Sequence, residues 1–76
     1  MDLSKIKIEI TSDISLRDGI GIEVFFKNTF VLDIFRDDIK KTKEMTLFKK
    51  DVSLELIEFS IKKFKELIPQ DYIDYH

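Results

Sequence analysis

Carboxylates gather in the middle of the chain, where they could bind a metal ion or transfer protons. Asp33, Asp37 and Asp38 lie close together around Arg36, and Glu23 shares strand parity with Asp33 and Asp37. Paired carboxylates can bind Mg²⁺ or serve as a general acid and base. Neither a histidine nor a glycine-rich loop accompanies this cluster. The pattern therefore favours a solvated strand end that runs into a charged turn, and a divalent-metal or small-ligand site is the alternative.

Few other side chains of the chain are suited to catalysis. The sequence contains no cysteine, and its one histidine is His76, the last residue. A serine nucleophile needs a nearby base, and no serine of this chain has a histidine close to it in the sequence. We therefore expect no catalytic, metal-binding or cofactor-binding residues, and a protein that is not an enzyme.

The charge of the chain is nearly balanced, with 13 basic and 15 acidic residues and a net charge of −2. Because nucleic-acid binding requires a strongly basic surface, we expect no nucleic-acid partner. One local excess of positive charge surrounds the fourth predicted strand and consists of Lys40, Lys41, Lys43, Lys49 and Lys50. Lysines at a sheet edge commonly prevent edge-to-edge aggregation, and this interpretation is favoured over an anion-binding site.

The start of the sequence lacks the basic and apolar regions of a signal peptide, and no apolar run reaches membrane-spanning length. We therefore expect a cytoplasmic protein without a membrane partner. Isoleucine, lysine and phenylalanine are abundant. These residues have AT-rich codons, which suggests a bacterial or phage source.

Alternating apolar and polar residues predict four β-strands, over residues 5–11, 20–27, 29–37 and 44–48. The first three follow this alternation clearly. The fourth is ambiguous, because either Met45 and Leu47 or Thr46 and Phe48 could face the core. We favour Met45 and Leu47, since that pair is wholly apolar.

After the strands the apolar period becomes that of a helix. The apolar stripe of this helix consists of Leu54, Ile57, Ile61, Phe64 and Ile68. Asp51 or Ser53 can cap the first turn, and Pro69 ends the helix. Residues 1–76 therefore form one small ββββα domain of the α+β class: a four-stranded antiparallel meander with a C-terminal helix packed on one face, and a short tail at residues 69–76.

The second and third strands are so close in sequence that they must form a hairpin around Asn28. A three-residue loop pairs Phe26 with Phe30 and keeps the aliphatic side chains of both strands on one face. A two-residue loop shifts the pairing by one residue and places Asp33 in the core, at a high cost in free energy. We therefore expect a three-residue loop or a β-bulge.

Several large apolar residues fall outside the core that this arrangement predicts. Phe25, Val31 and Phe35 alternate with Glu23 and Asp33 on the sheet face opposite the helix. A contiguous exposed apolar patch usually marks a partner surface. These five residues are therefore the predicted protein interface.

Two alternatives would remove this patch. The tail could fold back over it through Tyr72, Ile73 and Tyr75, or the hairpin register could be wrong by one residue, which would turn the patch inward. Leu56 and Phe59 also lie off the main helical stripe. We expect them at the edge of the core, where a curved sheet reaches around the flank of the helix.

A small domain with an apolar sheet face and no catalytic motif is typical of a protein-interaction module. We expect a non-enzymatic protein that binds a partner protein or forms a homodimer. Its size suits a stoichiometric inhibitor, such as an immunity protein or a phage or mobile-element protein. A small-ligand or metal-binding protein that uses the acidic cluster is one alternative, and a structural subunit of a larger assembly is another.

Overall fold

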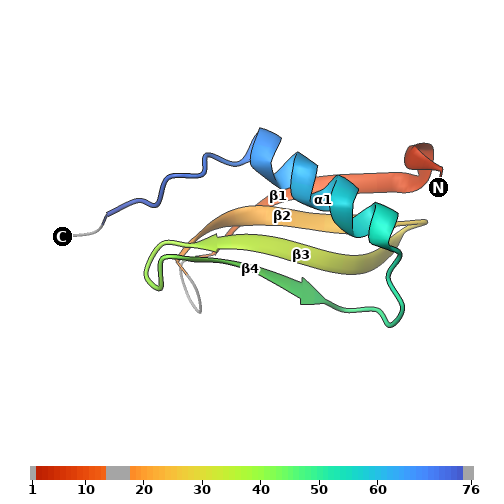
Figure 1. Cartoon of the computed structure of the whole chain (residues 1–76), viewed down its shortest axis with the longest axis horizontal. Helices are drawn as coiled ribbons and strands as arrows, with labels where there is room; N and C mark the ends of the chain where they lie inside the picture. The colour runs from red at the N-terminus through yellow and green to blue at the C-terminus, as the bar shows by residue number, and fades with distance from the viewer. Residues whose placement is uncertain (1, 14–17, 75–76) are drawn as a thin grey trace.

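The computed structural model describes residues 2–13 and 18–74, which form a four-stranded antiparallel sheet with a helix on one face (Figure 1). The strands are β1 (Ile6–Asp13), β2 (Gly19–Phe26), β3 (Thr29–Asp37) and β4 (Thr42–Leu47). A 3₁₀ turn, η1 (Leu3–Lys5), precedes them, and helix α1 (Leu54–Leu67) follows. The strand order β1-β2-β3-β4 confirms the predicted ββββα meander.

The strand register places apolar side chains of neighbouring strands side by side beneath the helix. Ile8 of β1 lies opposite Val24 of β2, which in turn lies opposite Leu32 of β3. Leu32 also lies opposite Leu47 of β4. Cross-strand apolar pairs of this kind each contribute roughly 0.2–1 kcal/mol to a sheet. The predicted choice of Met45 and Leu47 for the helix side of β4 is consistent with this register.

The β2–β3 hairpin turns through two residues rather than the expected three. Lys27 and Asn28 have φ of 50° and 65°, and positive φ at both central residues defines a type I′ turn, whose twist matches that of the strands. Phe26 therefore lies opposite Thr29. The predicted pairing of Phe26 with Phe30 is wrong.

A β-bulge then restores the register of this hairpin. The sequence predicts either a three-residue loop or a bulge, and the structure contains the bulge. Phe25 is paired with Phe30, yet the next pair along the ladder joins Val24 to Leu32, so Val31 is an extra residue in β3. A bulge of this kind inserts one unpaired residue and bends its strand. Because of it, Asp33 pairs with Glu23, and the aliphatic residues of β3 stay under the helix.

Helix α1 begins after Ser53, whose Oγ accepts a hydrogen bond from the N–H of Leu56 at 3.2 Å. Of the two predicted caps, Ser53 is the one used. The helix ends as expected before Pro69, with the N–H of Ile68 donating to the carbonyl of Phe64. None of the described helices combines the length and apolar character needed to cross a membrane.

The buried face of α1 is rotated from the predicted stripe. Leu56, Ser60 and Phe64 are buried and Ile68 follows them, whereas Leu54 is 69% exposed and Ile61 is 36% exposed. Ser60 is fully buried and donates from Oγ to the Leu56 carbonyl at 2.7 Å. A small residue at the contact lets the helix approach the sheet closely, so the row through Ser60 becomes the inner one. Leu56 therefore lies in the core and not at its edge.

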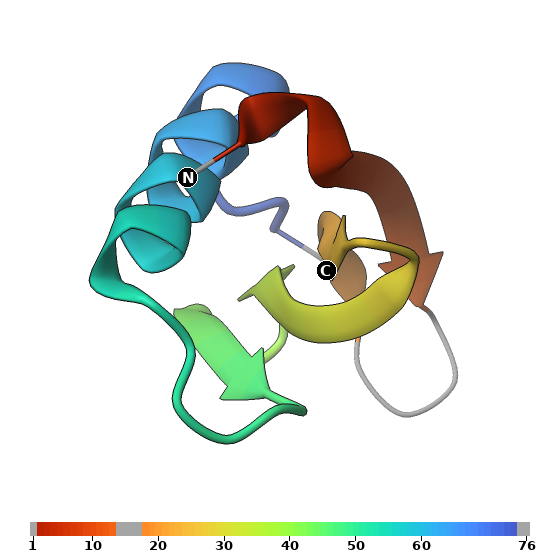
Figure 2. The ribbon, with the colours of Figure 1, turned by 90° about the vertical axis from the view of Figure 1, so that its right-hand side faces the viewer.

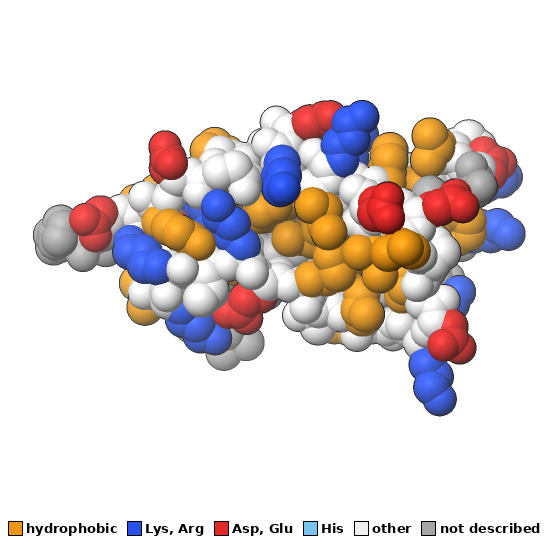
Figure 3. Space-filling view, in the orientation of Figure 1, with side chains coloured by type: hydrophobic (Ala, Val, Ile, Leu, Met, Phe, Trp, Pro, Cys, Tyr) orange, Lys and Arg blue, Asp and Glu red, His pale blue; other side chains and the backbone are white. Residues whose placement is uncertain are grey.

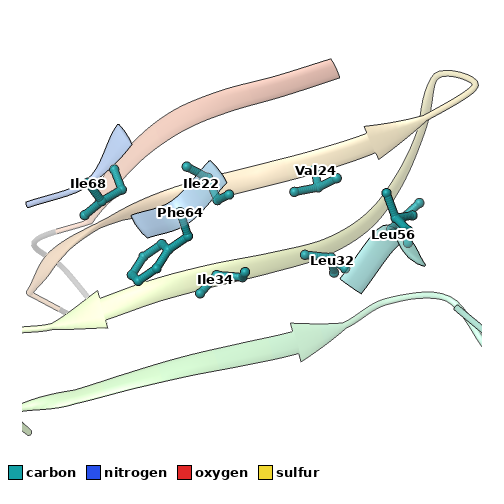
Figure 4. Packing of buried hydrophobic residues seen from close by; sticks show 8 residues of the cluster. Ile22, Val24, Leu32, Ile34, Leu56, Phe64 and Ile68 are labelled. Carbon is teal, nitrogen blue, oxygen red and sulfur yellow. The ribbon is translucent and has the colours of Figure 1, made fainter. Parts of the chain in front are cut away.

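The core lies between α1 and the two central strands, where the helix makes its main contacts. Figure 4 shows Leu56, Phe64 and Ile68 of the helix segment directed at β2 and β3 residues such as Ile22 and Ile34. Figure 2 shows a curled sheet with α1 on its concave side and β4 at one edge of the sheet. Strand β4 is thus an edge strand that the helix leaves uncovered.

Candidate functional site

The carboxylates of the predicted acidic cluster are drawn into separate structural roles. Asp38 is buried, and Arg36 donates to both of its oxygens, from Nε to Oδ1 at 2.8 Å and from Nη2 to Oδ2 at 3.0 Å. Asp37 accepts at Oδ1 from the N–H groups of Ile39 and Lys40, at 3.1 and 3.0 Å. Asp37 therefore organises the turn between β3 and β4, and Asp38 forms a buried ion pair with Arg36.

The Arg36–Asp38 pair also holds the chain that follows α1. Arg36 Nη1 donates to the Pro69 carbonyl at 2.6 Å, and the Ile73 N–H donates to Asp38 Oδ1 at 3.1 Å. Burial raises the pKa of Asp38, but the hydrogen bonds from Arg36 and from the Ile73 N–H outweigh it and hold the pKa below its ordinary value. An ionised Asp38 thus ties the tail to the sheet.

The remaining two residues of the predicted acidic cluster, Glu23 and Asp33, lie on the sheet face opposite the helix. Glu23 is the direct cross-strand neighbour of both Glu9 and Asp33. Like charges placed opposite each other across strands are destabilising. Among the residues that the structure describes, no group of three or more metal-ligating side chains is placed to hold a metal ion. The geometry lends no support to a metal site in this cluster.

Two of the five residues predicted as a protein interface are apolar side chains that the structure buries. Val31 is 2% exposed and belongs to the core cluster, because the bulge turns it to the helix side with Leu32. Phe35 keeps the predicted face but is 1% exposed. It lies opposite Gly21, and its ring comes within 3.3 Å of where a Cβ of Gly19 would be. The expectation that Val31 and Phe35 are exposed is therefore wrong.

The other three predicted interface residues lie on the face opposite the helix, with different exposures. Asp33 is 5% exposed, whereas Phe25 and Glu23 are half-buried. Phe25 is part of a row of stacked rings, with centroid distances of 5.1 Å to Phe30 and 4.5 Å from Phe30 to Phe48. The ring of Phe48 is the most accessible of the row, with 54% of this residue exposed.

The tail lies at the β3–β4 turn rather than over this face. Lys41 donates from Nζ to the Ile73 carbonyl at 2.8 Å and lies 3.6 Å from a carboxylate oxygen of Asp74. The ammonium groups of Lys41 and Lys43 lie 5.9 and 5.2 Å from the ring centroid of Tyr72. Tyr72 and Ile73 therefore do not cover Phe25. Tyr75, the third residue of that alternative, lies outside the described residues.

An exposed apolar surface lies between α1 and β4. We call it the α1–β4 groove, and its residues are Met45 and Leu47 of β4 with Leu54, Ile57 and Ile61 of α1. Leu47 is 50% exposed, Leu54 and Ile61 are exposed as given above, and Met45 and Ile57 are half-buried against the core. Figure 3 shows apolar side chains gathered between the helix and β4.

Strand register and helix geometry explain why these side chains lie on the same side of the sheet. Met45 and Leu47 face the helix side of the sheet, since they lie opposite Ile34 and Leu32. Ile57 and Ile61 each follow a residue of the buried row by one position, a rotation of about 100°. This rotation directs them sideways from the sheet contact. Because the helix makes its main contacts with β2 and β3, its β4-facing flank and Leu47 of β4 remain partly exposed.

A small cavity opens where α1 begins. It has a volume of about 270 Å³, and its lining combines four apolar with three polar residues: Phe26, Val31, Val52 and Leu56, and Lys49, Asp51 and Ser53. Pockets for drug-sized ligands typically measure ~300–1,000 Å³. This cavity is slightly smaller and mostly apolar. The exposed residues Leu47 and Leu54 flank, in sequence, the β4–α1 connection that lines it.

Sequence reasoning missed the groove because it placed Leu54 and Ile61 in the core. One signal was present: Leu47 and Phe48 are consecutive large apolar residues at the end of a short strand flanked by lysines. Neighbouring strand residues point to opposite faces, so no single layer can cover both.

No family model matches the chain, and no curated protein or solved structure was found that is similar enough to count as a relative.

Proposed function

We propose that this protein is a non-enzymatic protein-binding module that recognises its partner through the α1–β4 groove. The observation that carries the proposal is the exposure of Leu47, Leu54 and Ile61, together with the apolar surface that Figure 3 shows between the helix and the edge strand β4. Natural proteins blunt or cover their edge strands, because an open edge with apolar side chains promotes association. A contiguous apolar surface of this kind is typical of an interaction site.

The partner that fits this proposal is a different protein. The segment 40–50 carries five lysines and one acidic residue, Glu44. Pairing of two copies through β4 would place two such lysine-rich segments side by side, and like charges across an interface oppose association. A small domain that acts by occupying a partner surface would be a stoichiometric inhibitor, as an immunity protein is.

The test compares aspartate substitutions on the two edge strands. Leu47→Asp and Leu54→Asp place a charge in the groove, and Ile10→Asp is the matched control. Ile10 is 56% exposed, lies on the helix side of the sheet opposite Ile22, and belongs to the other edge strand. The measurement is capture of a partner from cells of the source organism, followed by reconstitution of the complex from purified components.

We expect the wild-type protein and Ile10→Asp to retain the same partner in a 1:1 complex, and both groove variants to lose it while their far-UV circular dichroism stays native. Equal retention by all four proteins would contradict the proposal. So would a wild-type dimer, detected by light scattering, that Leu47→Asp converts to a monomer, because a second copy would then fill the groove.

A further inference from the structure

The backbone of β4 presents an ordered row of hydrogen-bonding groups along the α1–β4 groove. The N–H of Phe48 donates to the Val31 carbonyl of β3 at 2.8 Å. In an antiparallel ladder the residues of an edge strand alternate between groups directed at the neighbouring strand and groups directed outward. The N–H and C=O groups of Lys43, Met45 and Leu47 therefore point away from β3.

The same residues turn their side chains toward the helix. Leu47 and Met45 lie opposite Leu32 and Ile34 on the helix side of the sheet. An extended segment laid along β4 would therefore form backbone hydrogen bonds with these residues and place every second side chain over the groove. That combination of an open edge and an apolar groove is the geometry for peptide recognition by strand addition.

Lysines at the two ends of the groove favour a bound segment with acidic ends. Lys43 lies on the groove side of β4, opposite Arg36 and 5.2 Å from the ring centroid of Tyr72, and Lys49 lines the cavity at the other end together with Asp51. The ion pairs of the described residues engage Lys40 and Lys41, but none engages Lys43 or Lys49. Carboxylates at both ends of a bound segment would complement these lysines.

We propose that the groove binds an extended segment of a partner protein that adds to β4 as a fifth strand, with apolar residues at alternate positions and aspartate or glutamate at both ends. This inference rests on the proposed function and specifies the partner's chemistry. The lysines around β4 then have two roles: they oppose pairing between copies of this chain, and they attract an acidic partner segment.

The first test is a selection from a phage-displayed library of random twelve-residue peptides, with the wild-type protein as bait and Leu54→Asp as the counter-selection bait. We expect enriched peptides with apolar residues of period two and acidic residues at the ends. Peptides with apolar residues at helical spacing of three and four would overturn strand addition while leaving the groove as a binding site. Failure to find any peptide that distinguishes the two baits would overturn the groove itself.

The second test uses a selected peptide with methyl groups on alternate backbone nitrogens. Strand addition predicts that one methylated set weakens binding by at least about tenfold, because it removes hydrogen bonds to β4. The set shifted by one residue should bind within about threefold of the unmodified peptide, since its amides face solvent. Equal affinity of both sets would contradict strand addition, whatever the peptide's composition.

Substitutions in β4 remove a backbone hydrogen bond from the protein side of the complex, as methylation does from the peptide side. Met45→Pro removes an outward N–H, and Met45→Ala removes the side chain but keeps that N–H. Proline is tolerated on an edge strand where its missing N–H faces solvent. We expect Met45→Pro to bind the peptide at least about tenfold more weakly than Met45→Ala. Equal binding by the two folded variants would overturn the proposal, and the methylated peptides decide the matter if Met45→Pro does not fold.

A charge-reversal variant tests the proposed attraction between the lysines and an acidic peptide. Replacing both Lys49 and Lys50 by glutamate should weaken binding of an acidic-ended peptide by about fivefold or more at low ionic strength, with the difference shrinking in high salt. The same variant should bind a lysine-ended version of the peptide better than the wild-type protein does. An unchanged preference for acidic ends would contradict the role of these lysines.

Discussion

At the scale of single residues, the Arg36–Asp38 ion pair decides how the end of the chain is held. Both side chains are almost fully buried, at 3% and 0% exposure, and each also bonds the backbone of the tail. A buried charge is tolerated only when it is paired and its remaining hydrogen-bonding capacity is used. Asp38, which the sequence places in a possible metal-binding cluster, thus pairs with Arg36 in a structural clamp that holds the tail.

Asp38→Asn should lower the free energy of unfolding by about 3–5 kcal/mol, because it leaves the Arg36 guanidinium buried without its counter-charge. Chemical denaturation followed by circular dichroism measures this change. Glu44→Gln is the control, since it removes an exposed carboxylate that pairs with Lys40 and the Thr42 hydroxyl. A loss for Asp38→Asn no larger than for Glu44→Gln would show that the clamp is unimportant.

The lowered pKa of Asp38 also predicts how stability depends on pH. A carboxyl whose pKa is lower in the folded state than in the unfolded state contributes stability that is complete above the unfolded pKa, near 4. This contribution is lost as the pH falls through the folded pKa. The difference in unfolding free energy between wild type and Asp38→Asn should therefore be largest near neutral pH and shrink below pH 4. A difference that stays constant down to pH 2 would rule out this linkage.

At the scale of elements, the β2–β3 hairpin depends on a turn and a bulge that act together. The type I′ turn at Lys27 and Asn28 alone would shift the register of the hairpin by one residue. The bulge at Val31 shifts it back, so that Ile22 and Val24 meet Ile34 and Leu32 under the helix. The turn supplies the twist, and the bulge restores the apolar face.

Val31→Ala tests the placement of the bulge residue. With Val31 in the core, removing two methyl groups should cost about 2 kcal/mol or more of unfolding free energy, from lost burial and from the cavity left behind. Thr46→Ala, at an exposed position of β4, should change it by less than about 0.5 kcal/mol. Similar small losses for both variants, in parallel urea denaturations, would place Val31 on the solvent side.

The elements themselves were largely predictable from the sequence, because each depends on a local pattern. Thr29–Asp37 forms the third strand with its predicted bounds, the other strands shift by one or two residues, and Ser53 caps the helix as one of two candidates. The rotation of α1 was not predictable in this way. It depends on the fit of Ser60 against the sheet, and helical period alone favours the more apolar stripe through Leu54 and Ile61.

The exposure predicted for the interface residues was wrong for Val31 and Phe35. A surplus of apolar residues does reach the surface, but on the helix side of β4 as well as around Phe25. Local alternation cannot reveal a bulge that turns Val31 inward, nor that Gly21 lies opposite Phe35 and Gly19 leaves room for its ring. Both effects arise from contacts between strands, which a single stretch of sequence does not encode.

At the scale of the whole molecule, a single helix covers the central strands and leaves the β4 side open. Leu54 is a large apolar residue that the fold leaves exposed at the first position of α1. Leu54→Asp should therefore raise the midpoint of thermal unfolding slightly, because an acidic residue near a helix N-terminus contributes about 0.3–1 kcal/mol. The same variant should lose partner binding. A marked fall in the unfolding midpoint would mean that Leu54 serves the fold and not recognition.

Amide hydrogen exchange measured by NMR tests the claim that β4 is a docking edge. In the free protein the amides of Lys43, Met45 and Leu47 should exchange much faster than those of Thr46 and Phe48. Addition of a saturating groove-binding peptide should slow exchange at these three amides while leaving the β1 edge, at Ile8 and Ile10, unchanged. Slow exchange of the three amides in the free protein, or peptide-induced protection confined to β1, would contradict the claim.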